Sequence, residues 1–112
     1  MKSIKKIFHF NELKKNGKRY RKRFFDLVVT KCEEYENQDF GMTVITSKKI
    51  GNAIKRNKIR RWIKEYFRKS ESSILKNFNY LIITKFGIID YGREKIWQDI
   101  KDVIEKFREE NL

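Results

Sequence analysis

One segment of the chain, residues 53–69, has the pattern of a helix with two chemically different faces. Apolar residues recur at the i, i+3, i+4, i+7 and i+8 spacing of a single buried stripe, made of Ile59, Trp62, Ile63, Tyr66 and Phe67. The opposite side carries Asn57, Arg60, Arg61, Lys64 and Arg68. The segment therefore predicts a helix that packs its aromatic stripe on a sheet and holds a row of cations toward solvent.

The charge of residues 47–69 departs from the pattern of ordinary surface helices. This stretch holds ten Lys and Arg residues and a single acid, Glu65. Surface helices usually mix the two signs, because opposite charges at i, i+4 stabilise and like charges repel. Lys55, Arg56 and Lys58 also lie in the first turns, where the helix dipole disfavours cations. A bound polyanion would reverse the sign of each effect, so the pattern favours phosphate contact over an idle basic surface.

Length and charge restrict the classes of protein to which the chain can belong. A length of 112 residues predicts one domain, residues 1–112, with residues 1–8 as a basic arm. Residues 1–69 hold 21 Lys and Arg against 7 acids, whereas residues 70–112 hold 7 against 8. This uneven excess, within a net charge of +13, is typical of nucleic-acid binders.

The same sequence gives no sign of membrane insertion or export. No apolar run approaches the length of a membrane span, and the N-terminal residues lack the apolar stretch of a signal peptide. A single cysteine, Cys32, cannot form an internal disulfide, which fits a reducing compartment. We therefore expect a cytoplasmic protein with no membrane partner.

The remaining segments predict an α+β fold, a small two-layer α/β sandwich of order α-β-β-α-β-α. We expect a helix at 9–16 ending at Gly17, a cationic loop at 18–23, strands at 24–31, 42–47 and 80–85, and a helix at 92–110. Asn52 is the expected N-cap of the basic helix. The simplest pairing of the first two strands is an antiparallel hairpin, and the basic helix then bridges two strands that can be parallel neighbours.

Alternation along the first expected strand assigns its residues to two faces. One face carries Phe25, Leu27 and Val29. The other carries Phe24, Asp26, Val28 and Thr30. In the last helix, the expected buried stripe is Ile96, Ile100, Val103, Ile104 and Phe107, with Trp97 beside it.

The sequence contains no pattern for a self-sufficient active site. His9 is the only histidine, which excludes a Ser–His–Asp triad, and no zinc, calcium or nucleotide-loop motif occurs. The carboxylates are scattered over a loop and the last helix, so we expect no catalytic residue, metal site or cofactor on the protein. The patterns of RRM and KH domains are also missing. A DNA-binding regulator is disfavoured, because no helix precedes Asn52 to complete a helix-turn-helix.

The basic segment resembles the signature of the bacterial ribonuclease P protein subunit. That signature has a strand ending in Ser-Lys-Lys, a Gly-Asn-Ala turn, and Arg-Asn-Arg at the start of a basic helix. The matching residues here are SKKIGNAI at 47–54, KRNKIRR at 55–61 and EYFR at 65–68. Weaker similarity covers nearly the whole chain, and the order and size of the elements also fit.

The resemblance implies a function that spacing alone does not show. Members of the family pair with a catalytic RNA, and together they remove the 5′ leader of precursor tRNA. The RNA performs the hydrolysis with bound Mg²⁺, and the protein is a non-catalytic subunit with no obligate protein partner. The fold implied is an α+β sandwich with a left-handed crossover, against the usual right-handed preference.

The resemblance also assigns roles to particular residues. The expected RNA-binding residues are Lys48, Lys49, Asn52, Arg56, Asn57, Lys58, Arg60, Arg61, Lys64 and Arg68. Lys58 replaces the usual second Arg of the motif, which keeps the charge and loses the planar fork. A cleft for the leader is expected between the first helix and one sheet face, lined by Phe10, Lys14, Phe24 and Val28. The alternative left open is an RNA-binding structural protein, such as a small ribosomal protein.

Overall fold

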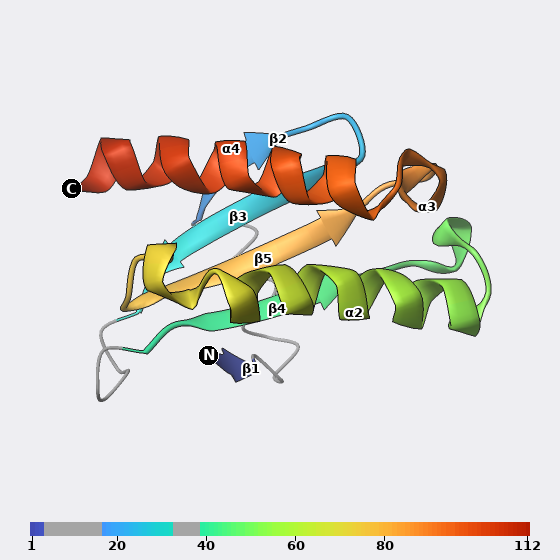
Figure 1. The fold of residues 1–112 in the computed structure, drawn as a ribbon, viewed down its shortest axis with the longest axis horizontal. Helices are drawn as coiled ribbons and strands as arrows, with labels where there is room; N and C mark the ends of the chain where they lie inside the picture. The colour runs from blue at the N-terminus through green and yellow to red at the C-terminus, as the bar shows by residue number, and fades with distance from the viewer. Residues whose placement is uncertain (4–16, 33–38) are drawn as a thin grey trace.

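The structure, a computed structural model, describes residues 1–3, 17–32 and 39–112. In these residues a five-stranded sheet carries two long helices on one face (Figure 1). The strands are β1 (Lys2–Ser3), β2 (Lys18–Arg21), β3 (Phe25–Lys31), β4 (Gly41–Ile45) and β5 (Phe78–Thr84). The helices are α2 (Ala53–Lys69), α3 (Ile88–Tyr91) and α4 (Arg93–Asn111), with 3-10 turns η2 (Lys48–Ile50) and η3 (Glu71–Ser73). The predicted mixed α+β class is confirmed.

The strand β5 lies in the middle of the sheet, whose order is β1-β4-β5-β3-β2. Ile82 of β5 lies opposite Leu27 of antiparallel β3 and opposite Val44 of parallel β4. The expected hairpin between β3 and β4 is therefore wrong. β3 and β4 do not pair because β5 lies between them. The almost continuously apolar β5 is buried best with a strand on each side. The parallel pairing of the two strands that flank the basic helix is confirmed.

The connection from β4 through α2 to β5 has the unusual hand. In Figure 1 both strands point to the right, α2 lies toward the viewer, and the chain moves up from β4 to β5. A right-handed crossover, which is the strong default in proteins, would place β5 below β4 in this view. The crossover is therefore left-handed, in agreement with the resemblance.

The expected cationic loop at 18–23 is in part a strand. Lys18–Arg21 form β2, an edge strand that pairs with β3 and places Tyr20 opposite Leu27. Tyr20 is buried, and its ring meets that of Phe107 edge-on, with centroids 6.3 Å apart. The surrounding cations obscure this strand in the sequence, although cations are common on edge strands because they oppose pairing with other chains.

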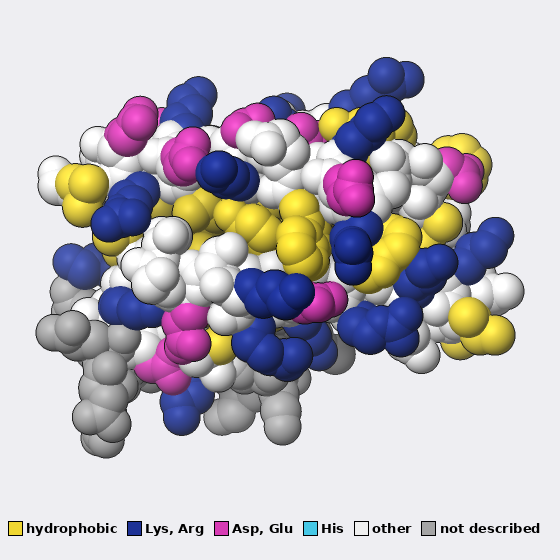
Figure 2. All heavy atoms as spheres, viewed as in Figure 1, with side chains coloured by type: hydrophobic (Ala, Val, Ile, Leu, Met, Phe, Trp, Pro, Cys, Tyr) yellow, Lys and Arg dark blue, Asp and Glu magenta, His cyan; other side chains and the backbone are white. Residues whose placement is uncertain are grey.

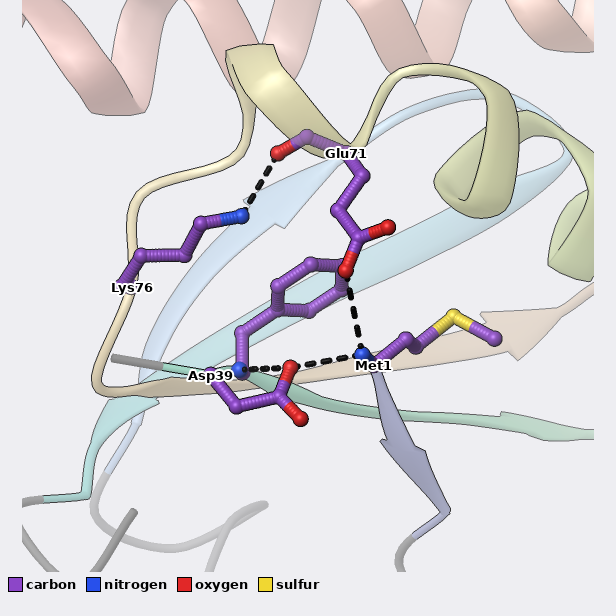
Figure 3. Close-up of polar contacts among 5 residues, drawn as sticks. Met1, Asp39, Glu71 and Lys76 are labelled. Carbon is purple, nitrogen blue, oxygen red and sulfur yellow. Dashed lines mark hydrogen bonds and ion pairs between the residues drawn. The ribbon is translucent and has the colours of Figure 1, made fainter. Parts of the chain in front are cut away.

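The N-terminal residues join the opposite edge of the sheet. Lys2–Ser3 form β1, which runs parallel to β4, so these two residues of the expected arm belong to the sheet. The Met1 ammonium lies 2.6 Å from Oδ1 of Asp39 and 3.3 Å from Oε1 of Glu71 (Figure 3). Its hydrogen bond to Asp39 holds the pKa of that carboxyl below the ordinary value. The expected helix at 9–16 and residues 4–8 of the arm lie outside the described residues.

The main core lies between the sheet and the two long helices. Phe25, Leu27 and Val29 of β3 enter it as predicted. The contributions of the helices also match the expected stripes: Ile59, Ile63, Tyr66 and Phe67 from α2, and Ile96, Ile100, Val103, Ile104 and Phe107 from α4. Trp62 and Trp97 are only half-buried, and Nε1 of Trp97 donates a hydrogen bond to the Trp62 carbonyl at 2.9 Å. This bond ties the two helices together.

Candidate nucleic-acid interface

The turn before α2 fixes where the basic helix begins. Residues Lys48–Ile50 form a 3-10 turn that buries Ile50 and leaves both lysines exposed. Gly51 follows with a φ of 146°, a backbone conformation that side-chain-bearing residues rarely adopt. Asn52 then caps α2, because its Oδ1 accepts a hydrogen bond from the Lys55 N–H at 3.0 Å. The N-cap expected from the sequence is confirmed.

Three cations in the first half of α2 are held by neighbouring groups. Arg56 donates from Nη1 to the carbonyl of Gly51 at 3.0 Å. Arg60 donates from Nη1 to Oδ1 of Asn57 at 3.1 Å. The Lys58 ammonium lies 5.1 Å from the centroid of the Trp62 ring, within cation–π range. These contacts restrict long side chains that would otherwise be freely mobile, and so reduce the entropy that binding must remove.

The exposed face of α2 is a nearly unbroken cationic surface. The helix contains eight Lys and Arg residues and one acid. Figure 2 shows dark blue Lys and Arg side chains over α2, while acidic side chains gather over α4. All ten residues expected to contact RNA are exposed or half-exposed: Lys48, Lys49, Asn52, Arg56, Asn57, Lys58, Arg60, Arg61, Lys64 and Arg68. Their contact with RNA stays a prediction.

The single acid of α2 is engaged at the far end of the helix. Glu65 forms an i, i+4 ion pair with Lys69, whose Nζ lies 3.1 Å from Oε1. The hydrogen bond from Lys69 holds the pKa of Glu65 below its ordinary value. Lys69 and Arg68 lie in the last turn, where the helix dipole favours cations. The unfavourable charges are therefore concentrated at the start of α2, beside the turn.

The opposite face of the sheet carries an ion cluster, centred on the buried Asp26, that sequence reasoning missed. Asp26 of β3 places Oδ2 2.7 Å from Nη1 of Arg19 and Oδ1 2.7 Å from Nζ of Lys85. Burial raises the pKa of Asp26, but the hydrogen bonds from Lys85 and Arg19 outweigh burial and hold that pKa below its ordinary value. The sequence treats Asp26 as isolated, because its partners come from β2 and from the end of β5.

The residues expected to line a leader cleft are not brought together in the described part of the chain. Phe10 and Lys14 lie outside it. Val28 is fully buried in a small cluster with Leu81, away from the main core. Phe24 instead packs against the main core, with its ring centroid 4.5 Å from that of Tyr91. Its predicted face is wrong because β3 begins only at Phe25, so strand alternation does not apply to Phe24.

The described residues hold neither a candidate metal site nor a candidate membrane-spanning helix. Residues 1–3, 17–32 and 39–112 contain no group of three or more His, Cys, Asp or Glu side chains that could hold a metal ion. Among the helices in the same ranges, none is both long and apolar enough to cross a membrane. Cys32, half-buried, directly follows β3, as expected for a small residue at a strand end.

Comparison with known proteins identifies the family. A protein-family model described as Ribonuclease P matches residues 1–108. The chain belongs to the ribonuclease P protein family. Among curated relatives, the ribonuclease P protein component of Staphylococcus aureus strain Mu3 is 42% identical over 101 residues, which cover 90% of this chain and 85% of that protein. The component from Macrococcus caseolyticus is 38% identical over 82 residues, covering 73% and 69%.

Solved structures of the family have the same fold. The structure of the Staphylococcus aureus RNase P protein is similar with a TM-score of 0.80 and 30% identity, over 94% of both chains. The RNase P protein from Thermotoga maritima gives a TM-score of 0.83 over 95% of this chain and 97% of its own, at 19% identity. The resemblance stated from residues 47–68 is therefore confirmed at the level of family and fold.

The ion cluster at Asp26 predicts a specific dependence of stability on pH. A carboxyl whose pKa is lowered by folding stabilises the protein above its unfolded pKa, and this contribution is lost as the pH falls through the folded pKa. We expect Asp26→Asn to lower the free energy of unfolding near pH 7 by about 1–3 kcal/mol, since it leaves two cations without their carboxylate. Urea unfolding at several pH values should show that the difference in free energy of unfolding between the variant and wild type becomes smaller below about pH 4.

Asp90→Asn is the matched control, because Asp90 is an exposed residue of α3. Its effect on unfolding should be small at every pH. A gap for Asp26→Asn that stays constant down to pH 3 would contradict the assignment of Asp26 as the charged centre of the cluster.

Proposed function

We propose that this chain is the protein subunit of ribonuclease P and that it binds the catalytic RNA through the exposed face of α2. The observation that carries the proposal is the sorting of α2, whose Ile59, Ile63 and Phe67 are fully buried while its cations face outward. The family works with an RNA subunit, and this membership favours the proposal over a small ribosomal protein.

The physical basis is neutralisation of phosphate charge. Each Lys or Arg that contacts a phosphate releases condensed counterions, which supplies a sequence-independent part of the affinity. Arg56 and Arg60 are already held by Gly51 and Asn57, so their guanidinium groups lose less freedom on binding. An RNA on this face would also relieve the repulsion among the like charges of α2.

We assign hydrolysis to the RNA subunit and its Mg²⁺, as the family resemblance implies. The protein then acts as a non-catalytic subunit of an endonuclease that removes the 5′ leader of precursor tRNA. Its own part is to bind, to neutralise and to position RNA, and no chemical step is assigned to its side chains. The cytoplasm is the compartment that fits this role.

Reconstitution tests the proposed function. The purified protein alone should leave precursor tRNA intact. The protein, the cognate catalytic RNA and Mg²⁺ together should release the leader, even at a low Mg²⁺ concentration. Gel analysis of end-labelled precursor measures the cleavage. Robust cleavage by the protein after removal of all RNA, or no effect of the protein on the RNA-catalysed reaction, would refute the proposal.

Neutralising one exposed cation of α2 should weaken RNA binding without unfolding the protein. Arg61→Gln should reduce affinity for the catalytic RNA and lower the slope of log K against log salt by about one, the value for one lost phosphate contact. Arg108→Gln makes the same charge change on the exposed surface of α4 and serves as the matched control. Filter binding at several salt concentrations distinguishes them, and equal slopes for both variants would show that α2 is not the contact face.

The leader is assigned to a different surface, on the resemblance alone. Phe10→Ala in the assembled enzyme should weaken binding of leader-bearing precursor by about five-fold or more, the loss expected for one stacked base. Binding of mature tRNA should stay nearly constant, because mature tRNA lacks the leader. An equal loss for both ligands would mean that Phe10 supports the fold and does not contact the leader.

A further inference from the structure

Two turns at one end of the sheet are hydrogen-bonded to each other. Residues 22–24 connect β2 to β3, and residues 85–87 connect β5 to α3. The Lys85 N–H donates to the Phe24 carbonyl at 2.8 Å, and Lys85 Nζ donates to the Lys22 carbonyl, also at 2.8 Å. Figure 1 shows α3 and the beginning of α2 at this same end of the sheet. The paired turns therefore lie near the start of the basic helix.

Phe86, in the second of these two hydrogen-bonded turns, is exposed to solvent. Its side chain is 80% exposed, although Lys85 before it is bonded twice and Ile88 shortly after it is fully buried. Gly87 has a φ of 91°, and a Cβ at this position would lie 2.9 Å from Cε1 of Phe24. A glycine here thus permits both the left-handed backbone and the close approach of the Phe24 ring. The backbone on both sides of Phe86 is held, so its ring is presented at a defined place.

The charge around Phe86 favours an anionic ligand. Arg21, Lys22 and Arg23 lie on the end of β2 and the adjoining turn, and the Arg23 guanidinium lies 5.2 Å from the centroid of the Phe24 ring. Of the acids near the two turns in the described residues, Asp26 is engaged by Arg19 and Lys85, and Asp90 lies on α3. Asp99 accepts a hydrogen bond from the Tyr91 hydroxyl, and Asp102 lines a hollow together with Arg21 and Lys22. Within the described residues, Lys22 and Arg23 form no ion pair with these acids, so both remain available to an anion beside the turn that carries Phe86.

A single exposed apolar residue is ordinary on protein surfaces and needs no ligand to explain it. Ile54 and Leu112 are similarly exposed, at 78% and 84%. Phe86 differs from them in having a flat aromatic ring on a backbone that is hydrogen-bonded to the neighbouring turn, and Lys22 and Arg23 lie in that turn. Aromatic rings next to cationic side chains are the elements from which proteins build sites for single-stranded nucleic acid.

We propose that Phe86 is a stacking site for one unpaired nucleotide of a bound RNA, whose phosphates lie against Lys22 and Arg23. The proposal rests on the proposed function only in that the chain binds RNA. It adds a second contact surface, separate from the exposed face of α2, and it predicts a preference for unpaired over paired RNA. Duplex bases are already stacked on one another and cannot cover the ring, whereas an unpaired base can.

The test compares Phe86→Leu and Phe86→Trp with wild type on two RNAs. The probes are a short single-stranded oligoadenylate and a fully paired RNA duplex with the same number of phosphates. Phe86→Leu keeps an apolar side chain without a ring and should weaken oligoadenylate binding by about five-fold or more. Phe86→Trp should retain wild-type affinity, and the oligoadenylate should quench its tryptophan fluorescence more than that of wild type, which already contains Trp62 and Trp97. Duplex affinity and the salt dependence should be unchanged in both variants.

Two results would overturn the stacking site. The first is wild-type affinity of Phe86→Leu for the oligoadenylate. The second is an equal loss of single-strand and duplex binding, which would indicate a general change in the surface. Because Phe86 is 80% exposed, both variants should keep the thermal stability of wild type, so a folding defect does not confuse the comparison.

The source of the nucleotide is identified in the assembled enzyme. A photoreactive benzoylphenylalanine at position 86 should crosslink either to the catalytic RNA or to the precursor, and the mapped position names the source. Absence of a crosslink to either RNA would overturn the proposal. If the protein fails to support cleavage while Phe86→Leu still loses oligoadenylate binding, the proposed function fails and the stacking site stands. If reconstitution succeeds and Phe86→Leu changes the affinity for neither probe, the proposed function stands and the stacking site fails.

Discussion

The packing of α2 on the sheet is the constraint from which the rest of the surface follows. Ile59, Ile63 and Phe67 are fully buried and lie on one side of the helix. Because side chains on a helix are fixed relative to one another at 3.6 residues per turn, burial of this stripe determines which residues face solvent. Removing any of these three side chains would cost about 2–5 kcal/mol, far more than an exposed ion pair contributes. The core thus holds the cations outward without any contribution from the cations themselves.

The cations at the start of α2 lower the stability of the isolated protein. Lys55, Arg56 and Lys58 lie near the N-terminal end of α2, where the helix dipole is positive, and no acid occupies the first turn. The N-cap Asn52 and the glycine turn before it set the helix start by hydrogen bonds and backbone conformation, which salt and charge affect little. The helix therefore forms despite its charge, and the repulsion remains available to be relieved by a polyanion.

The sequence predicted what is encoded locally and failed where distant segments meet. The α2 stripe and the Asn52 cap depend on neighbours within one or two turns, so their residue spacing is sufficient. Strand order depends on which segments pair across the chain, and nothing within residues 41–45 specifies that β5 is their neighbour. Tyr20 stands between cations in the sequence, so the strand β2 that contains it was not predicted. Without β2, Arg19 could not be recognised as a partner of Asp26. The solvent-facing residues of α2 could be predicted for the same reason as its buried stripe, since the same helical period places both.

The sheet separates two groups of cations that act under different constraints. Those of α2 lie on the helix side. Among the described residues, only Lys69 of this group forms an ion pair with an acid, Glu65, which leaves a row of cations suited to a line of phosphates. Arg19 and Lys85 lie on the other side and are fixed by Asp26, so they have little freedom to follow a ligand. Phe86 directly follows Lys85 at the end of the sheet, in the turn between β5 and α3. In the proposed complex, an unpaired base of an RNA bound along α2 would stack on this exposed ring, while the cations of α2 would contact its phosphates.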